Sequence, residues 1–296
     1  MRTKLLLAAL LASVAATASA GEAKPPALAG QGYVEEQASL GATRLTIRRP
    51  ADAEKFYGAV VIEPNAGAEA AGWRAAGTAL MAHGDVWVGL AGPADQLADT
   101  AKLLRDGEQS PLAKPGLLKR AANLQGVLKI YAVGWGPAAC GVGDFIASNK
   151  AEQAKRTDGR PLLNGYVLGG CDKVQELKPP KGAALIRIAT EKDYPAAASL
   201  RRADGNVAGE DWHRWYDIQA AGKCQTPDAL LASSLGGLDR WMRTGVPAPA
   251  GKLFDLGDDK RPKKDAPGGL GADCDDATAT FAKDKTPPES ARKPSL

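Results

Sequence analysis

Short apolar runs alternate with helix-like stretches along this chain, and that alternation constrains its fold more than any other feature. The apolar runs are four to seven residues long, and segments with helical periodicity follow several of them. Strands that alternate with helices are typical of an α/β domain with a mainly parallel sheet, whose sites lie at the strand ends. The sequence predicts strands at 59–62, 86–90, 130–133, 165–168, 184–189 and 212–218, and helices at 72–83, 117–124 and 230–244.

Composition narrows the possible functions. The chain has 296 residues, of which 44% are hydrophobic and 24% charged, which is enough for one large domain and excludes wholesale disorder. The net charge of +4 comes without a basic block, so we expect no nucleic-acid partner. Histidine occurs only twice, as His83 and His213. With so little imidazole, we expect no metal site and no cofactor.

The two ends of the chain differ in character from the rest. Residues 1–20 combine an early positive charge, an apolar stretch and the small-residue pattern Ala18-Ser19-Ala20, typical of a secretory signal cleaved after Ala20. The apolar stretch is too short for a membrane span, so we expect a periplasmic or secreted protein. Residues 21–250 form the predicted domain. Residues 251–296 hold nine basic and nine acidic residues with many Pro and Gly, which predicts a tail with little order.

Export also changes the interpretation of the cysteines. The chain has four, Cys140, Cys171, Cys224 and Cys274, without a C-x-x-C pair. In an oxidising compartment they most simply form two disulfides, with three possible connectivities.

Residues 130–146 have the layout of a nucleophile elbow, in which a G-x-S-x-G turn between a strand and a helix exposes a serine. Gly134 and Ala138 stand at the two small-residue positions, but Gly136 stands at the apex. The turn predicts the geometry of a hydrolase site without its nucleophile.

Several segments, taken in order, resemble one known family. They are 59–65, 80–90 (LMAHGDVWVGL), 130–141, 188–193 (IATEKD), 215–222 and 238–249 (LDRWMRTGVPAP). Together they span about residues 40–250 and are similar to the bacterial α/β-hydrolase domain family of exported hydrolase-like proteins. The resemblance implies an α/β-hydrolase fold.

The same resemblance places the family's catalytic pattern on this chain. Its serine falls on Gly136, its acid on Glu191 or Asp193, and its histidine at or next to Lys223. Gly136 cannot attack a substrate, and Lys223 is a base with nothing to activate, so two of the three positions cannot perform the original chemistry. The turn 65–67 keeps the place where such folds put oxyanion-hole amides.

The resemblance also indicates a remodelled pocket and a pairing of the cysteines. In this topology Cys171 ends beside the helix that bears Cys140, so we predict Cys140–Cys171 and Cys224–Cys274. Four aromatic residues near the predicted sheet edge have two interpretations, a pocket lining and ordinary core packing, of which core packing is favoured: Trp73, Trp135, Tyr194 and Trp212. The residues that we expect to line the pocket are Asn65, Ala66, Trp135, Gly136, Pro137 and Tyr194.

Three functions remain open from the sequence. The one it favours is a catalytically inactive α/β-hydrolase-fold protein that binds a small molecule, a polymer end or a protein. The second is an ester or amide hydrolase of altered mechanism that uses Lys223, Asp193 or Cys140. The third is a scaffold that acts through its surface or tail. Neither His83, at a predicted helix end, nor His213, between tryptophans, lies where the family needs its base.

Overall fold

A computed structural model describes residues 32–66, 70–123, 128–171, 173, 176–190, 212–218 and 228–248. Eight strands in this part of the chain form one sheet. The strands are β1 (Tyr33–Leu40), β2 (Thr43–Pro50), β3 (Ala59–Pro64), β4 (Val86–Leu90), β5 (Lys129–Trp135), β6 (Gly165–Gly169), β7 (Ala184–Thr190) and β8 (His213–Ile218). The α-helices are α1 (Ala71–His83), α2 (Leu97–Arg105), α3 (Leu117–Asn123), α4 (Pro137–Ala147), α5 (Lys150–Gln153) and α7 (Asp228–Thr244).

The sheet is mainly parallel and has the order β1-β2-β4-β3-β5-β6-β7-β8. Strands β3 to β8 run parallel to their neighbours, whereas β2 is antiparallel to both β1 and β4. The chain leaves β3 toward β4 on one side and returns to β5 on the other. The carboxyl ends of β3 and β5 therefore form a topological switch point, where open α/β sheets place their ligands.

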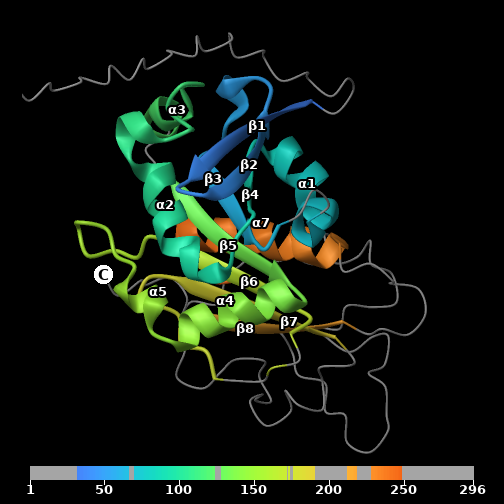
Figure 1. Cartoon of the computed structure of the whole chain (residues 1–296). Helices are drawn as coiled ribbons and strands as arrows, with labels where there is room; N and C mark the ends of the chain where they lie inside the picture. Colours follow the sequence, from blue (N-terminus) through green and yellow to red (C-terminus); the bar gives the residue numbers. More distant parts are fainter. Residues whose placement is uncertain are drawn as a thin grey trace, which may run out of the picture.

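Helices cover both faces of the sheet (Figure 1). Leu104 of α2 and Phe145 of α4 belong to the hydrophobic core on one face, whereas Leu80 of α1 and Leu238 of α7 belong to the core on the other. All six residues of β3 are buried. Burial on both faces explains why the central strands are continuous apolar runs rather than alternating ones.

The structure confirms the predicted α/β class and every strand and helix predicted from the sequence. The sequence interpretation missed β1, β2, α2 and the short helix α5. Strands β1 and β2 mix polar and apolar residues without a continuous apolar run or a regular alternation, and β1 contains two consecutive glutamates. Helix α2 buries a narrow stripe of residues that includes Leu97, Ala101 and Leu104. Polar residues stand between them in the sequence, so the helical periodicity of the stripe was not recognised.

A buried carboxylate from β3 holds the start of α1. The residue before the helix, Ala70, has no side chain that could cap it. Instead, Glu63 accepts hydrogen bonds from the backbone N–H groups of Gly72 (2.7 Å) and Trp73 (3.1 Å) and from Nε1 of Trp87 (3.1 Å). Its side chain lies so close that a Cβ at Gly72 would meet it at 2.6 Å. Burial raises the pKa of Glu63, although these hydrogen bonds oppose the rise.

We expect Glu63→Ala to lower the free energy of unfolding by about 3 kcal/mol, because it leaves buried N–H donors without an acceptor. Glu63→Gln keeps one acceptor oxygen and should cost about 1 kcal/mol. Since the folded-state pKa of Glu63 is raised, its ionisation removes stability as the pH rises through that pKa, and the Gln variant lacks this loss. Urea unfolding at several pH values measures both effects. An Ala variant as stable as wild type would contradict the capping role.

Candidate functional site

The candidate site lies at the switch point, where the carboxyl ends of β3, β5 and β6 meet. Gly136 follows β5 directly, and its backbone N–H donates to the carbonyl of Gly169 at the end of β6 (2.8 Å). On the β3 side, the side-chain Nδ2 of Asn65 lies 4.0 Å from the position that a Cβ on Gly141 of α4 would occupy. The strand ends and the start of α4 therefore surround one small region.

The turn from β5 into α4 has the geometry that the glycine spacing predicts. A Cβ at Gly134 would lie 2.6 Å from the backbone of Ala139, so only glycine lets the helix approach the strand this closely. Gly136 has φ 57° and ψ −127°, a conformation that L-residues rarely adopt. A Cβ built on Gly136 meets no atom within 4 Å. The apex thus projects into open space, as a nucleophile elbow requires, but it carries no side chain.

Position 137, directly after the apex, is a proline. In a nucleophile elbow, the backbone N–H of the residue after the nucleophile donates to the oxyanion of the reaction intermediate. Here that residue is Pro137, the first residue of α4, which has no N–H. The sequence analysis placed Pro137 in the pocket but did not draw this consequence, although the position directly after the apex was a sufficient signal.

The turn after β3 was expected to hold oxyanion-hole amides. Asn65 has a φ of 53° and is exposed at the end of β3. Its N–H donates to the carbonyl of Gly92 (2.8 Å), and the N–H of Ala66 donates to the carbonyl of Leu90 (3.0 Å). Both amides are therefore already engaged with the chain that follows β4. Gly67, the remaining residue of the expected motif, lies outside the described residues.

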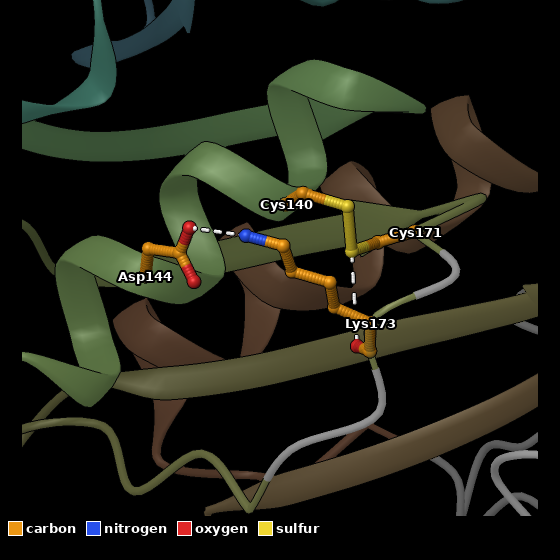
Figure 2. Close-up of a disulfide and its surroundings, with 4 residues drawn as sticks. All are labelled: Cys140, Asp144, Cys171 and Lys173. Carbon is orange, nitrogen blue, oxygen red and sulfur yellow. Dashed lines mark hydrogen bonds and ion pairs between the residues drawn. A yellow bond between two sulfur atoms is a disulfide. The ribbon is translucent and has the colours of Figure 1, made fainter.

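A disulfide between Cys140 and Cys171 confirms the first of the two predicted pairings (Figure 2). The bond joins the first turn of α4 to the residue that follows Gly170 at the end of β6, and the Cα atoms are 5.1 Å apart. Lys173 and Asp144 form an exposed ion pair beside it (2.9 Å). The elbow is therefore cross-linked to the neighbouring strand, and Cys140 is not a free thiol in this state.

The aromatic residues near the sheet edge serve mainly as packing. Trp73 packs edge-on against Tyr33 and lies 5.4 Å from Trp87, and Trp212 stacks on Trp241 of α7 at 5.8 Å. Both agree with the core role expected for Trp73 and Trp212.

The remaining pocket and triad predictions are tested only in part. The ring of Trp135 covers the end of β6, where a Cβ on Gly169 would collide with it. His213 is buried at the start of β8. Several sequence-predicted residues lie outside the described part of the chain, and their roles stay predictions: Glu191, Asp193, Tyr194, Lys223, Cys224 and Cys274.

The described residues hold no group of three or more His, Cys, Asp or Glu side chains placed to bind a metal ion. Among the helices of this same part of the chain, none combines the length and apolar character of a membrane span.

Comparison with known families gives one match. Residues 12–98 match the family described as "Alpha/beta hydrolase domain". The match covers the segments at 59–65 and 80–90 that carry part of the resemblance, and it ends before the elbow. No curated protein matches the chain.

Solved structures with similar folds include hydrolases at low sequence identity. An esterase from Rhizomucor miehei is 11% identical with a TM-score of 0.45, over 71% of this chain and 84% of the esterase. Esterase 2 from Thermogutta terrifontis, phosphorylated by paraoxon, is 14% identical with a TM-score of 0.43, over 74% and 96% of the two chains. S-formylglutathione hydrolase from Staphylococcus aureus is 9% identical with a TM-score of 0.40, over 71% and 95%.

The cross-link in Figure 2 should stabilise the domain. The two cysteines are 31 positions apart, so a loop of this length predicts a loss of about 3–4 kcal/mol in the free energy of unfolding when both become serine. Chemical unfolding of Cys140→Ser/Cys171→Ser beside wild type measures the loss. Reduced and alkylated wild type should lose a similar amount, and a double variant as stable as the oxidised protein would refute the contribution.

Proposed function

We propose that this chain is an α/β-hydrolase domain protein, which the family match over residues 12–98 supports, and that it is an exported binding protein whose site no longer catalyses hydrolysis. One observation carries the proposal. The elbow keeps its strained, exposed backbone at Gly136, but the nucleophile's side chain and the following N–H are both absent. Loss of the serine alone would leave an oxyanion donor, and loss of the donor alone would leave a nucleophile. When the serine and the oxyanion donor are both missing, the site can neither attack the substrate carbonyl nor stabilise the oxyanion that the attack would form.

The proposed ligand is a small molecule or a segment of a partner protein that enters at the carboxyl edge of the sheet. The open space above Gly136 supports this, because a ligand atom can occupy the volume that a serine hydroxyl would fill. Asn65, Ala66 and Pro137 lie at or beside this edge. The disulfide links helix α4, which starts at Pro137, to the chain that follows β6. A rigid pocket binds with a smaller ordering cost than a mobile one.

A hydrolase of altered mechanism is the second candidate. Of the three residues considered for it, Cys140 is held in the disulfide and cannot act as a thiolate while oxidised. Lys223 and Asp193 therefore carry this alternative. The signal peptide, cleavage after Ala20, and a periplasmic or secreted location belong to the proposal as sequence-based expectations.

Stepwise restoration of the catalytic groups tests the loss of catalysis. Wild type should hydrolyse p-nitrophenyl esters no faster than buffer. Gly136→Ser/Lys223→His restores a nucleophile and a base, and addition of Pro137→Ala restores the missing N–H. If the assigned positions are right, the triple variant should exceed the double variant by about 10²–10³-fold in kcat, the usual contribution of one oxyanion donor.

Gly136→Ala is the matched control, because it carries the same backbone strain of about 1–3 kcal/mol without a hydroxyl. Turnover by wild type that survives Gly136→Ala but disappears in Asp193→Asn would instead support the altered mechanism.

Obstruction of the open space tests ligand binding at the elbow. In a thermal-shift screen of small molecules, a compound present at 100 times its Kd should stabilise wild type by about 2.7 kcal/mol. Gly136→Leu fills the space and should abolish that shift. Gly159→Leu is the control, since Gly159 also has a positive φ and no neighbour within 4 Å but lies after α5, in another loop. A compound whose shift both variants retain binds elsewhere, and compounds of that kind alone would contradict the proposed pocket.

A further inference from the structure

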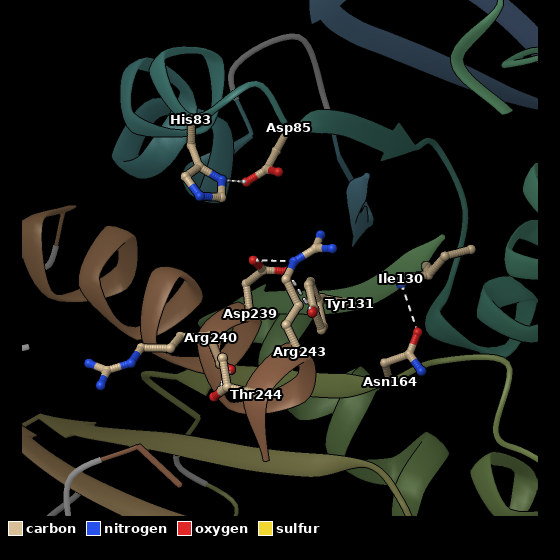
Figure 3. Close-up of polar contacts among 9 residues, drawn as sticks. All are labelled: His83, Asp85, Ile130, Tyr131, Asn164, Asp239, Arg240, Arg243 and Thr244. Carbon is tan, nitrogen blue, oxygen red and sulfur yellow. Dashed lines mark hydrogen bonds and ion pairs between the residues drawn. The ribbon is translucent and has the colours of Figure 1, made fainter. Parts of the chain in front are cut away.

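A second cluster of polar residues lies at the opposite edge of the sheet (Figure 3). His83 is the last residue of α1, and Asp85 directly precedes β4. Tyr131 lies near the start of β5 and faces Asp239 and Arg243 of α7. These residues join the amino ends of two strands to the ends of two helices, and the proposed pocket uses none of them.

The first half of the cluster is an ion pair with a buried acid. His83 Nδ1 lies 2.9 Å from Oδ2 of Asp85. The Asp85 side chain is 7% exposed and that of His83 is 46% exposed, so the acid is inside and the imidazole reaches solvent. A buried carboxylate needs a charged or hydrogen-bonding partner, and His83 is the one that the structure gives it.

The second half ties α7 to the sheet. Asp239 accepts hydrogen bonds from the hydroxyl of Tyr131 (2.8 Å) and from Nε of Arg243 (2.7 and 2.9 Å to its two oxygens). Asp239 is buried, and the hydroxyl of Tyr131 lies in the core beside it. This pair fixes the last turns of α7 against β5.

Arg243 connects the two halves. Its guanidinium lies beside Asp239 on the side of α7 that faces the His83–Asp85 pair (Figure 3), and it interacts electrostatically with Asp85. The ring of Tyr57 contacts both sides, with its centroid 4.5 Å from that of His83 and 4.7 Å from the guanidinium of Arg243. Oδ1 of Asp85 and Nη2 of Arg243 are buried and make no hydrogen bond within the described chain. The four charged groups thus form an alternating row when His83 is protonated.

We propose that His83 is a proton-dependent clamp, which in its charged form holds the end of α1 and the start of β4 to α7, and which loosens α7 when it loses its proton. Neutral His83 leaves Asp85 buried with a weaker partner, and the alternation that orders Arg243 is broken. α7 follows directly in sequence the segment that contains Lys223, so the clamp acts on the helix that begins after the family's histidine position.

The charges that face this row come from every element packed around it. Asp85 raises the pKa of His83 through its hydrogen bond, burial lowers that pKa, and Asp239 and Arg243 act in opposite directions at longer range. Lys129 at the start of β5 interacts with Arg243 and Asp239. The side chains of Lys55 and Arg240 are exposed, and that of Arg240 points away from the cluster (Figure 3). The net result is a raised pKa for His83.

The direction of the pH effect follows from the raised pKa. A group whose folded-state pKa lies above its unfolded value, about 6.5 for histidine, stabilises the fold below that value. The contribution is lost as the pH rises through the folded pKa. Burial raises the pKa of Asp85 as well, and the resulting loss of stability begins near 3.8, the unfolded-state value of aspartate, which lies below that of histidine.

Three measurements on the full chain test the clamp. Because the chain has only two histidines, NMR titration resolves them, and His83→Gln assigns the signal. We expect the pKa of His83 above 6.5 in wild type and closer to 6.5 in Asp85→Asn. The Tm of wild type should fall by about 2–4 °C relative to His83→Gln between pH 6 and pH 8.5.

Hydrogen exchange measured by mass spectrometry locates the effect. Intrinsic amide exchange rates depend on pH, so the exchange of wild type is compared with that of His83→Gln at the same pH, where these rates are equal in both proteins. Peptides from 228–244 should exchange several-fold more slowly in wild type at pH 6 and equally at pH 8.5. Asp95→Asn, which breaks the exposed 2.8 Å pair between Asp95 and Lys150, should leave both results unchanged.

A pKa of His83 at or below 6.5, or a protection difference that is the same at both pH values, would overturn the proposal. So would a difference confined to peptides of α1, since the clamp requires α7 to respond.

Discussion

The close contact between Gly134 in β5 and Ala139 in α4 determines the geometry of the carboxyl edge. Because a Cβ on Gly134 would lie 2.6 Å from the helix backbone, the strand must turn sharply into α4 at this point. The turn forces Gly136 into a conformation with positive φ and aims it into open space. In a hydrolase, the same strain presents the nucleophile. In this chain the turn has that geometry and carries a glycine at its apex.

Three features of the elbow stabilise the fold. Glycine at position 136 adopts the strained conformation without the cost of about 1–3 kcal/mol that a side chain carries. Pro137 is preorganised for the first position of α4 but supplies no N–H. The Cys140–Cys171 bond ties the helix to β6. Active sites commonly sacrifice stability for function, and at this elbow each of the three features favours stability.

Strand β5 links the two edges of the molecule. At its carboxyl end it leads into Gly136, and near its amino end Tyr131 bonds to Asp239 of α7. Glu63 has a comparable role on β3, since its buried carboxylate holds the start of α1 beside the switch point. The polar groups that organise the site are therefore buried hydrogen-bond acceptors on strands, and their partners are helix ends.

Much of this structure was encoded locally. The apolar runs predicted every strand from 59 onward, and glycine spacing predicted the elbow, because both signals depend on neighbouring residues. The half-polar strands β1 and β2 gave no such signal. The disulfide at Cys140 needed the strand order implied by family resemblance. The sequence by itself determined that Gly136 has no side chain and that Pro137 has no N–H. Only the tertiary structure decided that the amides of Asn65 and Ala66 are engaged and that His83 faces α7, because those contacts join residues far apart in the chain.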